Sequence, residues 1–234
     1  MSGYATYAGA SAAVLGLTVV ARVVDPPLFG QLIGGTEPAV VAALVSLLGA
    51  GLLHLLESHA GFAIIGRQFA RGLHRAAGLA ALFGVLVMGV DLVLTHPADM
   101  NVPFPASLLF YPVISLMAEI LFHLLPLAAL MMAISAFARH GAPESAVWVS
   151  LVLVSLLEPS FQVLAAVSER PVVGAPQAYD PRVVAYDGLH VWAINICQLS
   201  IFRRYDFVSM WTFRLVYYAI CHVVWGELRL RVLF

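Results

Sequence analysis

Long apolar stretches, separated by short polar ones, dominate the pattern along this chain. Seven mainly hydrophobic segments can be drawn, at about 7–24, 38–56, 76–95, 106–137, 145–167, 186–202 and 207–228. Most of them are close to the roughly 17–25 residues with which an α-helix crosses about 30 Å of hydrocarbon. No stretch alternates between apolar and polar residues as the strand of a membrane barrel does. The pattern therefore predicts an all-α, polytopic transmembrane bundle of six to seven spans.

Two of these segments depart from the simple pattern. The segment 106–137 is too long for one straight crossing, and it contains Pro112 and Pro126, which each remove a backbone hydrogen bond from a helix. We therefore expect either a bent span or a span with an interfacial continuation. The segment 186–202 is the shortest and the most polar, so its crossing has the weakest support. Its polar residues are His190, Trp192, Asn195 and Gln198.

Composition supports an integral membrane protein and excludes some partners. The chain is 62% apolar and 11% charged, with a mean hydropathy of +0.93, and its net charge of −1 provides no basic surface for nucleic acid. All basic residues are Arg, which together with the many Ala and Val residues is typical of a GC-rich genome, so we expect the inner membrane of a bacterium. Neither a repeat nor a linker divides the chain, so residues 1–234 are expected to form a single domain.

The basic residues predict an orientation in the membrane. The loop 57–75 holds a cluster of them, namely Arg67, Arg71, His74 and Arg75. Because cytoplasmic loops collect basic residues, we place this loop and the N-terminus inside, and the first segment, which has no basic region before it, is expected to be a permanent anchor. The same orientation puts further basic residues inside, at Arg139, His140, Arg203 and Arg204. It places Arg229 and Arg231 outside, a conflict that a re-entrant sixth segment would remove.

Ionisable side chains within the apolar segments are the strongest candidates for function. Glu119 and His123 are four residues apart and therefore share one face of a helix. In the next segment, Glu158 and Gln162 repeat this spacing. Because ionisable groups are costly inside a bilayer, such residues are functional candidates by default.

The last segment carries a third polar stripe with the same spacing. Arg214, Tyr218 and His222 follow one another at intervals of four residues. We predict that the three stripes converge on one hydrated pocket. The alternative is that they only hold helices together, with Arg214 neutralising a buried carboxylate and Glu158 marking the helix break that Pro159 causes.

Other polar or reactive residues are weaker candidates. Asp91 lies near the membrane interior, although His96 and the outer surface are close to it in the sequence. Cys197 and Cys221 both fall in predicted spans, where a thiol packs as a small apolar group, so we expect no disulfide.

Three stretches resemble the motifs of one known family. Residues 118–123 read AEILFH, and residues 202–226 read FRRYDFVSMWTFRLVYYAICHVVWG; between them lies LVSLLEPSFQVL, at 153–164. These stretches resemble, in order, the Glu-Glu-x-x-x-Arg, His-x-x-x-Asn/Asp and Phe-x-x-x-His motifs of the glutamic intramembrane endopeptidases of the CPBP family, which includes CAAX proteases, bacteriocin-processing and abortive-infection proteins. The resemblance covers roughly residues 105–228.

The resemblance implies a site that cleaves a hydrophobic or lipidated peptide inside the membrane. It implies catalytic roles for Glu119, Glu158 and His222, as general base and oxyanion donor. Substrate-binding or oxyanion roles would then belong to the neighbouring polar residues Gln162, Arg214, Tyr218 and His123. The chain departs from the motifs at four positions, because it has Ala118, His123, Gln162 and Gly226 where the family has Glu, Arg, His and Asn or Asp.

These departures leave other functions open. A relative without catalysis would be a scaffolding or binding subunit of a membrane complex. No cofactor is predicted from the motifs, but Glu119, His123, Glu158 and His222 have the chemistry of metal ligands, and His123 with His222 is the only deep pair that suits haem.

Overall fold

The chain is helical throughout the parts that its structure describes. The computed structural model describes residues 2–94, 96, 100–137, 143–168 and 180–234, and these residues contain helices and no strand. Six helical stretches within them are long and apolar enough to cross a membrane: Gly3–Val24, Pro38–Ala60, Phe69–Asp91, Ser107–Ala136, Glu144–Ala165 and Phe207–Val232. The predicted all-α bundle of six to seven spans is confirmed, with six helices that are long and apolar enough to cross a membrane.

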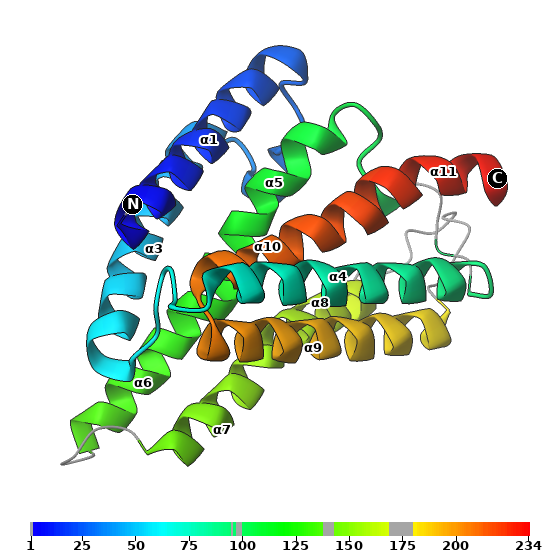
Figure 1. Ribbon diagram of the computed structural model, residues 1–234. Coiled ribbons are helices and arrows are strands. Elements are labelled where there is room, and N and C mark those ends of the chain that lie inside the picture. The colour runs from blue at the N-terminus through cyan, green and yellow to red at the C-terminus, as the bar shows by residue number, and fades with distance from the viewer. Residues whose placement is uncertain (1, 95, 97–99, 138–142, 169–179) are drawn as a thin grey trace.

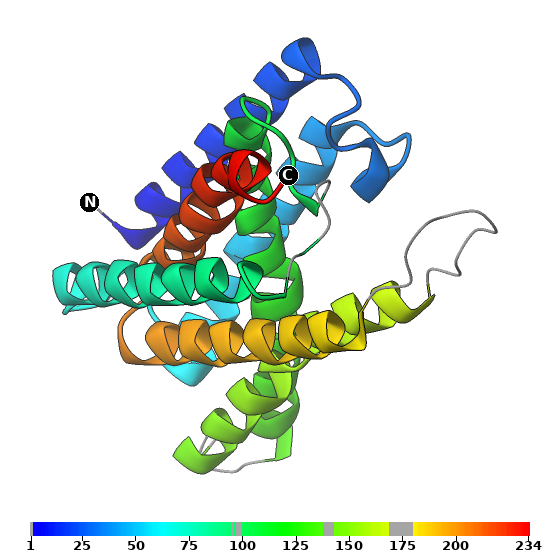
Figure 2. The same cartoon turned by 90° about the vertical axis from the view of Figure 1, so that its right-hand side faces the viewer.

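The helices pack in two groups, which are connected by a contact between α10 and α5 (Figures 1 and 2). In the first group, α1 (Gly3–Val24) packs against α3 (Pro38–Ala60) and α5 (Ser107–Ala118). In the second, α10 (Phe207–Tyr218) packs against α4 (Phe69–Asp91) and α9 (Pro181–Arg204), and it also contacts α5. The remaining elements continue or flank these helices: α2 (Gly30–Ile33), the π-helix η2 (Glu119–Leu124), α6 (Leu125–Phe137), α7 (Glu144–Ser155), α8 (Leu157–Ser168), the π-helix η3 (Ala219–Val224) and α11 (Trp225–Val232).

The predicted segments match these helices, with one larger difference. The predicted loop 57–75 is shorter than expected, because α3 continues to Ala60 and α4 begins at Phe69. Arg71 and Arg75 therefore lie in the first turns of α4, where both are exposed. An arginine is a good helix former and can keep its charge in water at a helix end, so its presence did not mark a loop.

The long fourth segment is interrupted by a π-helical turn. Within η2, the backbone widens, and the N–H of Leu125 bonds to the carbonyl of Ile120, five residues earlier. Pro126 follows directly, and its ring cannot fit a regular α-helical turn. The interruption predicted from the prolines therefore takes the form of a π turn, and it contains both Glu119 and His123.

The fifth segment is divided into α7 and α8 at Leu156. Pro159 lacks an N–H and cannot donate to the carbonyl of Ser155, four residues earlier. Asn195 of α9 supplies this missing donor, because its Nδ2 lies 3.4 Å from Ser155 O. The helix break predicted at Glu158 is present, but Glu158 is buried inside the protein.

At one end of the bundle, the end of α3 and the loop that follows it contact α9, α10 and the start of α1. Arg203 Nη1, at the end of α9, donates to the carbonyl of Ala60 at 3.0 Å, and Arg203 also forms an ion pair with Glu144 at the start of α7. The backbone N–H of Phe207 bonds to Ala63 O at 2.9 Å. A Cβ on Gly3 would lie 2.9 Å from Ile64, which places the start of α1 at this same end.

The helix α9 runs from this end to the opposite one. Near its beginning, Asp187 bonds to His96, which follows α4, while Arg203 near its end bonds to Ala60. α9 is an unbroken helix of 24 residues, which is long enough to cross a membrane, and the re-entrant sixth segment stays a prediction. Arg229 lies with Asp91 at the His96 end and is 1% exposed, so it is a buried partner of a carboxylate rather than a loop charge.

Small residues allow α4 and the last helical stretch to approach closely. Gly72, Ala76, Ala80 and Gly84 are all buried and recur every four residues along α4. A Cβ on Gly84 would lie only 2.6 Å from Ile220 Cγ2, so a larger residue has no space there. Such stripes of small residues are the usual means by which membrane helices pack closely.

Candidate functional site

Arg214 is the centre of a buried network of charges. Its side chain, on α10, is 3% exposed, and its Nη1 and Nη2 each donate to one carboxylate oxygen of Glu158 at 2.8 Å. Its Nε donates to Glu119 Oε1 at 2.7 Å. One guanidinium thus joins α10 to η2 and α8, in the forked geometry that makes arginine–carboxylate pairs strong.

Neutral side chains complete the hydrogen bonding of this arginine. Nη1 is 3.1 Å from Tyr218 OH, and Nη2 is 3.3 Å from both Asn195 Oδ1 and Gln198 Oε1. Arg214 therefore has partners for all its N–H groups, which a charge needs when it leaves water.

Glu119 is enclosed from every side. It is 0% exposed, its Oε2 lies 2.6 Å from His123 Nδ1, and its Oε1 also accepts from Gln198. The other ring nitrogen of His123 has no hydrogen-bond partner and lies 3.9 Å from Glu158 Oε2. Glu119 is thus held by three side chains, which supports its role as a structural counter-ion of Arg214.

His222, on the π-helix η3, has hydrogen-bond partners other than those of the Arg214 network. Its Nδ1 is 2.6 Å from Asn101 Oδ1, and this oxygen also accepts from Tyr111 OH at 3.3 Å. The ring of Tyr111 stacks on the imidazole, with centroids 4.8 Å apart and an angle of 17°. Because an amide oxygen only accepts, His222 Nδ1 is the donor, and its Nε2 carries the free lone pair.

Asn101 takes the place that the missing side chain of Gly226 leaves open. A Cβ on Gly226 would lie 3.3 Å from Asn101 Nδ2, one turn beyond His222 on the same helical stretch. The sequence has glycine where the resembling family has Asn or Asp, and here an asparagine from the segment before α5 packs against that glycine. His222 therefore has an amide partner from a distant part of the chain.

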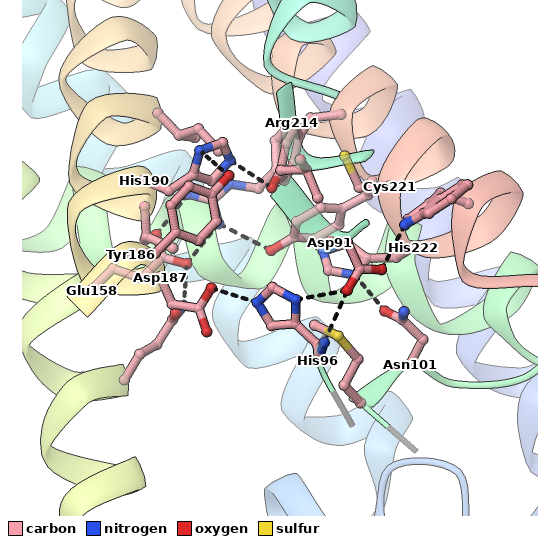
Figure 3. A pocket seen from close by; sticks show the side chains of 18 of the residues that line it. Asp91, His96, Asn101, Glu158, Tyr186, Asp187, His190, Arg214, Cys221 and His222 are labelled. Carbon is pink, nitrogen blue, oxygen red and sulfur yellow. Dashed lines mark hydrogen bonds and ion pairs between the residues drawn. The ribbon is translucent and has the colours of Figure 1, made fainter. Parts of the chain in front are cut away.

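Two neighbouring cavities have several polar lining residues in common. The central cavity, of about 190 Å³, is lined by five of the predicted site residues, namely Glu158, Gln162, Arg214, Tyr218 and His222 (Figure 3). The side cavity, of about 500 Å³, is lined by apolar residues that include Leu28, Phe110 and Ile114. Both cavities share a polar wall, which we define as Asn101, Gln162, Tyr218 and His222.

The structure thus brings most of the predicted site residues together. Glu158, Gln162, Arg214, Tyr218 and His222 share the central cavity. Glu119 and His123 are not among the described residues that line either cavity, and they lie behind Arg214. Of the described residues, no group of three or more His, Cys, Asp or Glu side chains is placed to hold a metal ion. Cys197 and Cys221 are free thiols.

A second buried ion-pair cluster also lines the central cavity. Asp91 accepts from Arg229 Nε at 2.6 Å and from Trp225 Nε1 at 2.8 Å. His96 links Asp91, at 2.8 Å from Nδ1, to Asp187, at 3.1 Å from Nε2 (Figure 3). The hydrogen bond to Asp187 raises the pKa of His96 above its ordinary value, with further support from Asp91 and against the effect of burial.

Several residues of the site were missed at the sequence level. Asn195 and Gln198 stood out only as polar residues of an uncertain span, although their spacing on α9 could have assigned them to one face. The sequence placed Arg229 only as a basic residue outside the membrane, and pairing it with Asp91 would have needed the depth of both residues. Asn101 gave no signal, because its role depends on the close approach to Gly226.

No protein-family model, no curated protein and no solved structure matches this chain.

Proposed function

We propose that the protein binds, within the bilayer, the polar end of an otherwise apolar molecule such as a hydrophobic or lipidated peptide. The observation that carries this proposal is the lining of the side cavity. The shared polar wall forms one part of this lining, and apolar residues that include Leu28, Phe110 and Ile114 form another. A ligand with a polar end and a hydrocarbon chain would place the first at the wall and the second along the apolar side. Binding cavities in proteins commonly combine an apolar lining with a few convergent polar groups in this way.

The charge network supports binding more than hydrolysis by Glu119. That carboxylate is 0% exposed and is bonded to Arg214, His123 and Gln198. A general base must come within hydrogen-bond distance of the water that it activates. Both Glu119 and Glu158 are held by Arg214, so the network stabilises the bundle behind the cavity.

A divergent intramembrane endopeptidase is the second candidate. It is favoured by His222, whose Nδ1 is fixed by Asn101 while its Nε2 is available to a ligand or water, and by Glu158 in the same cavity. An imidazole oriented by an amide in this way can act as a general base. A third possibility, a scaffolding subunit of a membrane complex, would use the same cavity for a segment of its partner.

The orientation proposed from the sequence agrees with the ends defined by the fold. Arg67, Arg71 and Arg203 lie at the end of the bundle that also contains the start of α1. We assign this end to the cytoplasm of a bacterial cell, because positive residues are retained there. The cavity wall and Arg229 then lie toward the outer side of the inner membrane.

Photo-crosslinking in lipid nanodiscs tests the proposed binding. The probes are 16-carbon amphiphiles that carry a diazirine in the chain, including a palmitoylated tripeptide. We expect crosslinks to the segments around the side cavity, and we expect Ile114→Trp, which fills the cavity, to reduce them at least tenfold. Leu82→Trp is the matched control, because Leu82 is 65% exposed on α4 and faces away from the cavity.

The result also separates the candidate functions. Crosslinks that Ile114→Trp leaves unchanged would overturn the proposed cavity. Cleavage of the tripeptide, detected by mass spectrometry and lost in His222→Ala, would favour the endopeptidase instead. A protein partner that copurifies in stoichiometric amount, with crosslinks to none of the probes, would favour the scaffold.

A further inference from the structure

The polar wall has a chemical character that narrows the ligand class. All its side chains are uncharged amides, a phenol and an imidazole, from Asn101, Gln162, Tyr218 and His222. The described residues that line the side cavity include no Asp, Glu, Lys or Arg. A charged ligand end placed at this wall would therefore have no counter-ion in the side cavity.

The charges that line the central cavity are already paired with one another. Glu158 is bonded to Arg214, Arg229 to Asp91, and His96 to Asp91 and Asp187. To bind an anion, Arg214 would have to give up one of its two carboxylates in a buried setting. Breaking a buried ion pair leaves a charge without a counter-ion away from water, so an anionic ligand is disfavoured.

The wall offers both a hydrogen-bond acceptor and donors. His222 Nε2 carries a free lone pair because Nδ1 donates to Asn101. Tyr218 OH accepts from Arg214 Nη1, so its own hydrogen is free to donate. Asn101 Oδ1 is occupied by His222 and Tyr111, which leaves the Nδ2 hydrogens of Asn101 as additional donors.

The two polar groups at the centre of this wall are close neighbours. The rings of Tyr218 and His222 meet edge to face, with centroids 5.0 Å apart and an angle of 81°. The ring of Tyr111 stacks on the imidazole and also meets the ring of Tyr218, with centroids 5.6 Å apart, so the three rings form one cluster. A single oxygen atom that can both donate and accept would satisfy this pair.

We infer that the ligand recognised here is an uncharged amphiphile that ends in a hydroxyl group, such as a long-chain alcohol. The hydroxyl donates to His222 Nε2 and accepts from Tyr218 OH, while its hydrocarbon chain follows Phe110 and Ile114. Phe110 is stacked on Phe29, with centroids 5.4 Å apart, which gives the chain a firm apolar wall. This inference rests on the proposed binding function and names its ligand class.

Competition between matched amphiphiles tests this inference. In nanodiscs, hexadecanol, hexadecanoate, hexadecyl phosphate and hexadecyltrimethylammonium compete with a diazirine-bearing 16-carbon alcohol for crosslinking to the full-length protein. We expect hexadecanol to compete at a concentration at least tenfold lower than each charged compound. Equal or stronger competition by a charged compound would overturn the hydroxyl assignment.

Two variants test the donor and the acceptor separately. Loss of one hydrogen bond costs about 0.5–1.5 kcal/mol, so Tyr218→Phe and His222→Phe should each weaken hexadecanol competition by about 2- to 10-fold. Tyr4→Phe is the matched control, because the Tyr4 hydroxyl bonds to Glu57, far from the cavity. Hexadecanol competition that is unchanged in both wall variants would overturn the assignment.

The outcomes distinguish this inference from the function on which it rests. If a charged amphiphile binds best and Ile114→Trp still removes the crosslinks, the cavity binds ligands and only the hydroxyl assignment fails. If no amphiphile is crosslinked at the cavity, the binding function and the inference both fail.

Discussion

At the scale of single residues, Arg214 is the position on which the buried network depends. We expect Arg214→Gln to leave Glu119 and Glu158 buried without a counter-ion and to lower stability by about 3–5 kcal/mol. Thermal unfolding in detergent measures this effect. Arg71→Gln, at an exposed arginine of α4, is the matched control and should change stability by less than about 0.5 kcal/mol.

The source of this loss can be checked by removing the carboxylate charges as well. Glu119→Gln and Glu158→Gln, added to Arg214→Gln, should recover part of the lost stability because no unpaired charge then remains in the core. If the triple variant is less stable than Arg214→Gln alone, the interaction is packing rather than charge compensation.

Contacts between site residues of the same helix were predictable from their spacing along the sequence. The four-residue intervals of Glu119 with His123, and of Arg214 with Tyr218, correctly indicated side chains that contact each other. Contacts between helices were predictable only as alternatives, since Arg214 could pair with either glutamate and in fact binds both. The bond of His222 to Asn101 was beyond prediction, because it depends on the space above Gly226.

At the scale of helices, the small-residue stripe of α4 determines how closely α10 and η3 pack. Gly84→Ala would place a Cβ 2.6 Å from Ile220 Cγ2, and overpacking of this kind costs about 1–3 kcal/mol. Gly78→Ala is the control on the same helix, because no other atom lies within 4 Å of its Cβ position. We expect a lower unfolding temperature for Gly84→Ala, and no decrease for Gly78→Ala. Equal effects would show that helix propensity, not packing, is being measured.

The cluster after α4 predicts a dependence of stability on pH. The pKa of His96 is raised from its ordinary value of 6.5, first by the hydrogen bond to Asp187. A raised pKa means that the charged ring stabilises the folded state below pH 6.5 and that this contribution is lost as pH rises through the folded-state pKa.

The measurement compares the unfolding temperatures of the protein and of His96→Gln between pH 5 and 9. The difference between them should be largest at the acidic end and should decrease toward alkaline pH. A difference that grows with pH would contradict a charged His96 between Asp91 and Asp187. Asp187→Asn should reduce the pH dependence, since it removes the largest cause of the shift.

The helices themselves were largely predictable from apolar length, and the exceptions have physical causes. Hydrophobic runs located the seven long helical stretches of the described residues, but α4 begins earlier than predicted because arginines at its exposed start are compatible with helix. The prolines indicated that these helices are interrupted, but not what form each interruption takes. Both a π turn, as at Glu119, and a helix break, as at Leu156, can accommodate the missing N–H of a proline.

At the scale of the whole molecule, the number of membrane crossings depends on whether the polar helix α9 crosses. Among the described residues, six helical stretches are long and apolar enough to be recognised as spans, and α9 is not one of them. Its polar residues Asn195 and Gln198 are 0% exposed, because they bond to Ser155, Arg214 and Glu119. A helix whose polar groups are satisfied within the protein can cross a bilayer without being apolar throughout.

We expect α9 to cross the membrane, which would place the two ends of the chain on opposite sides, and labelling of introduced cysteines tests this directly. With Cys197 and Cys221 replaced by alanine, Arg231→Cys should react with a membrane-impermeant maleimide in intact cells whose outer membrane has been opened. Arg71→Cys should react only after the inner membrane is permeabilised. Both residues are exposed, so accessibility to the reagent depends on the side of the membrane alone. Labelling of both cysteines from the same side would mean an even number of crossings between them. It would contradict the crossing that we expect for α9, whose Asp187 contacts His96 at one end and whose Arg203 contacts Ala60 at the other.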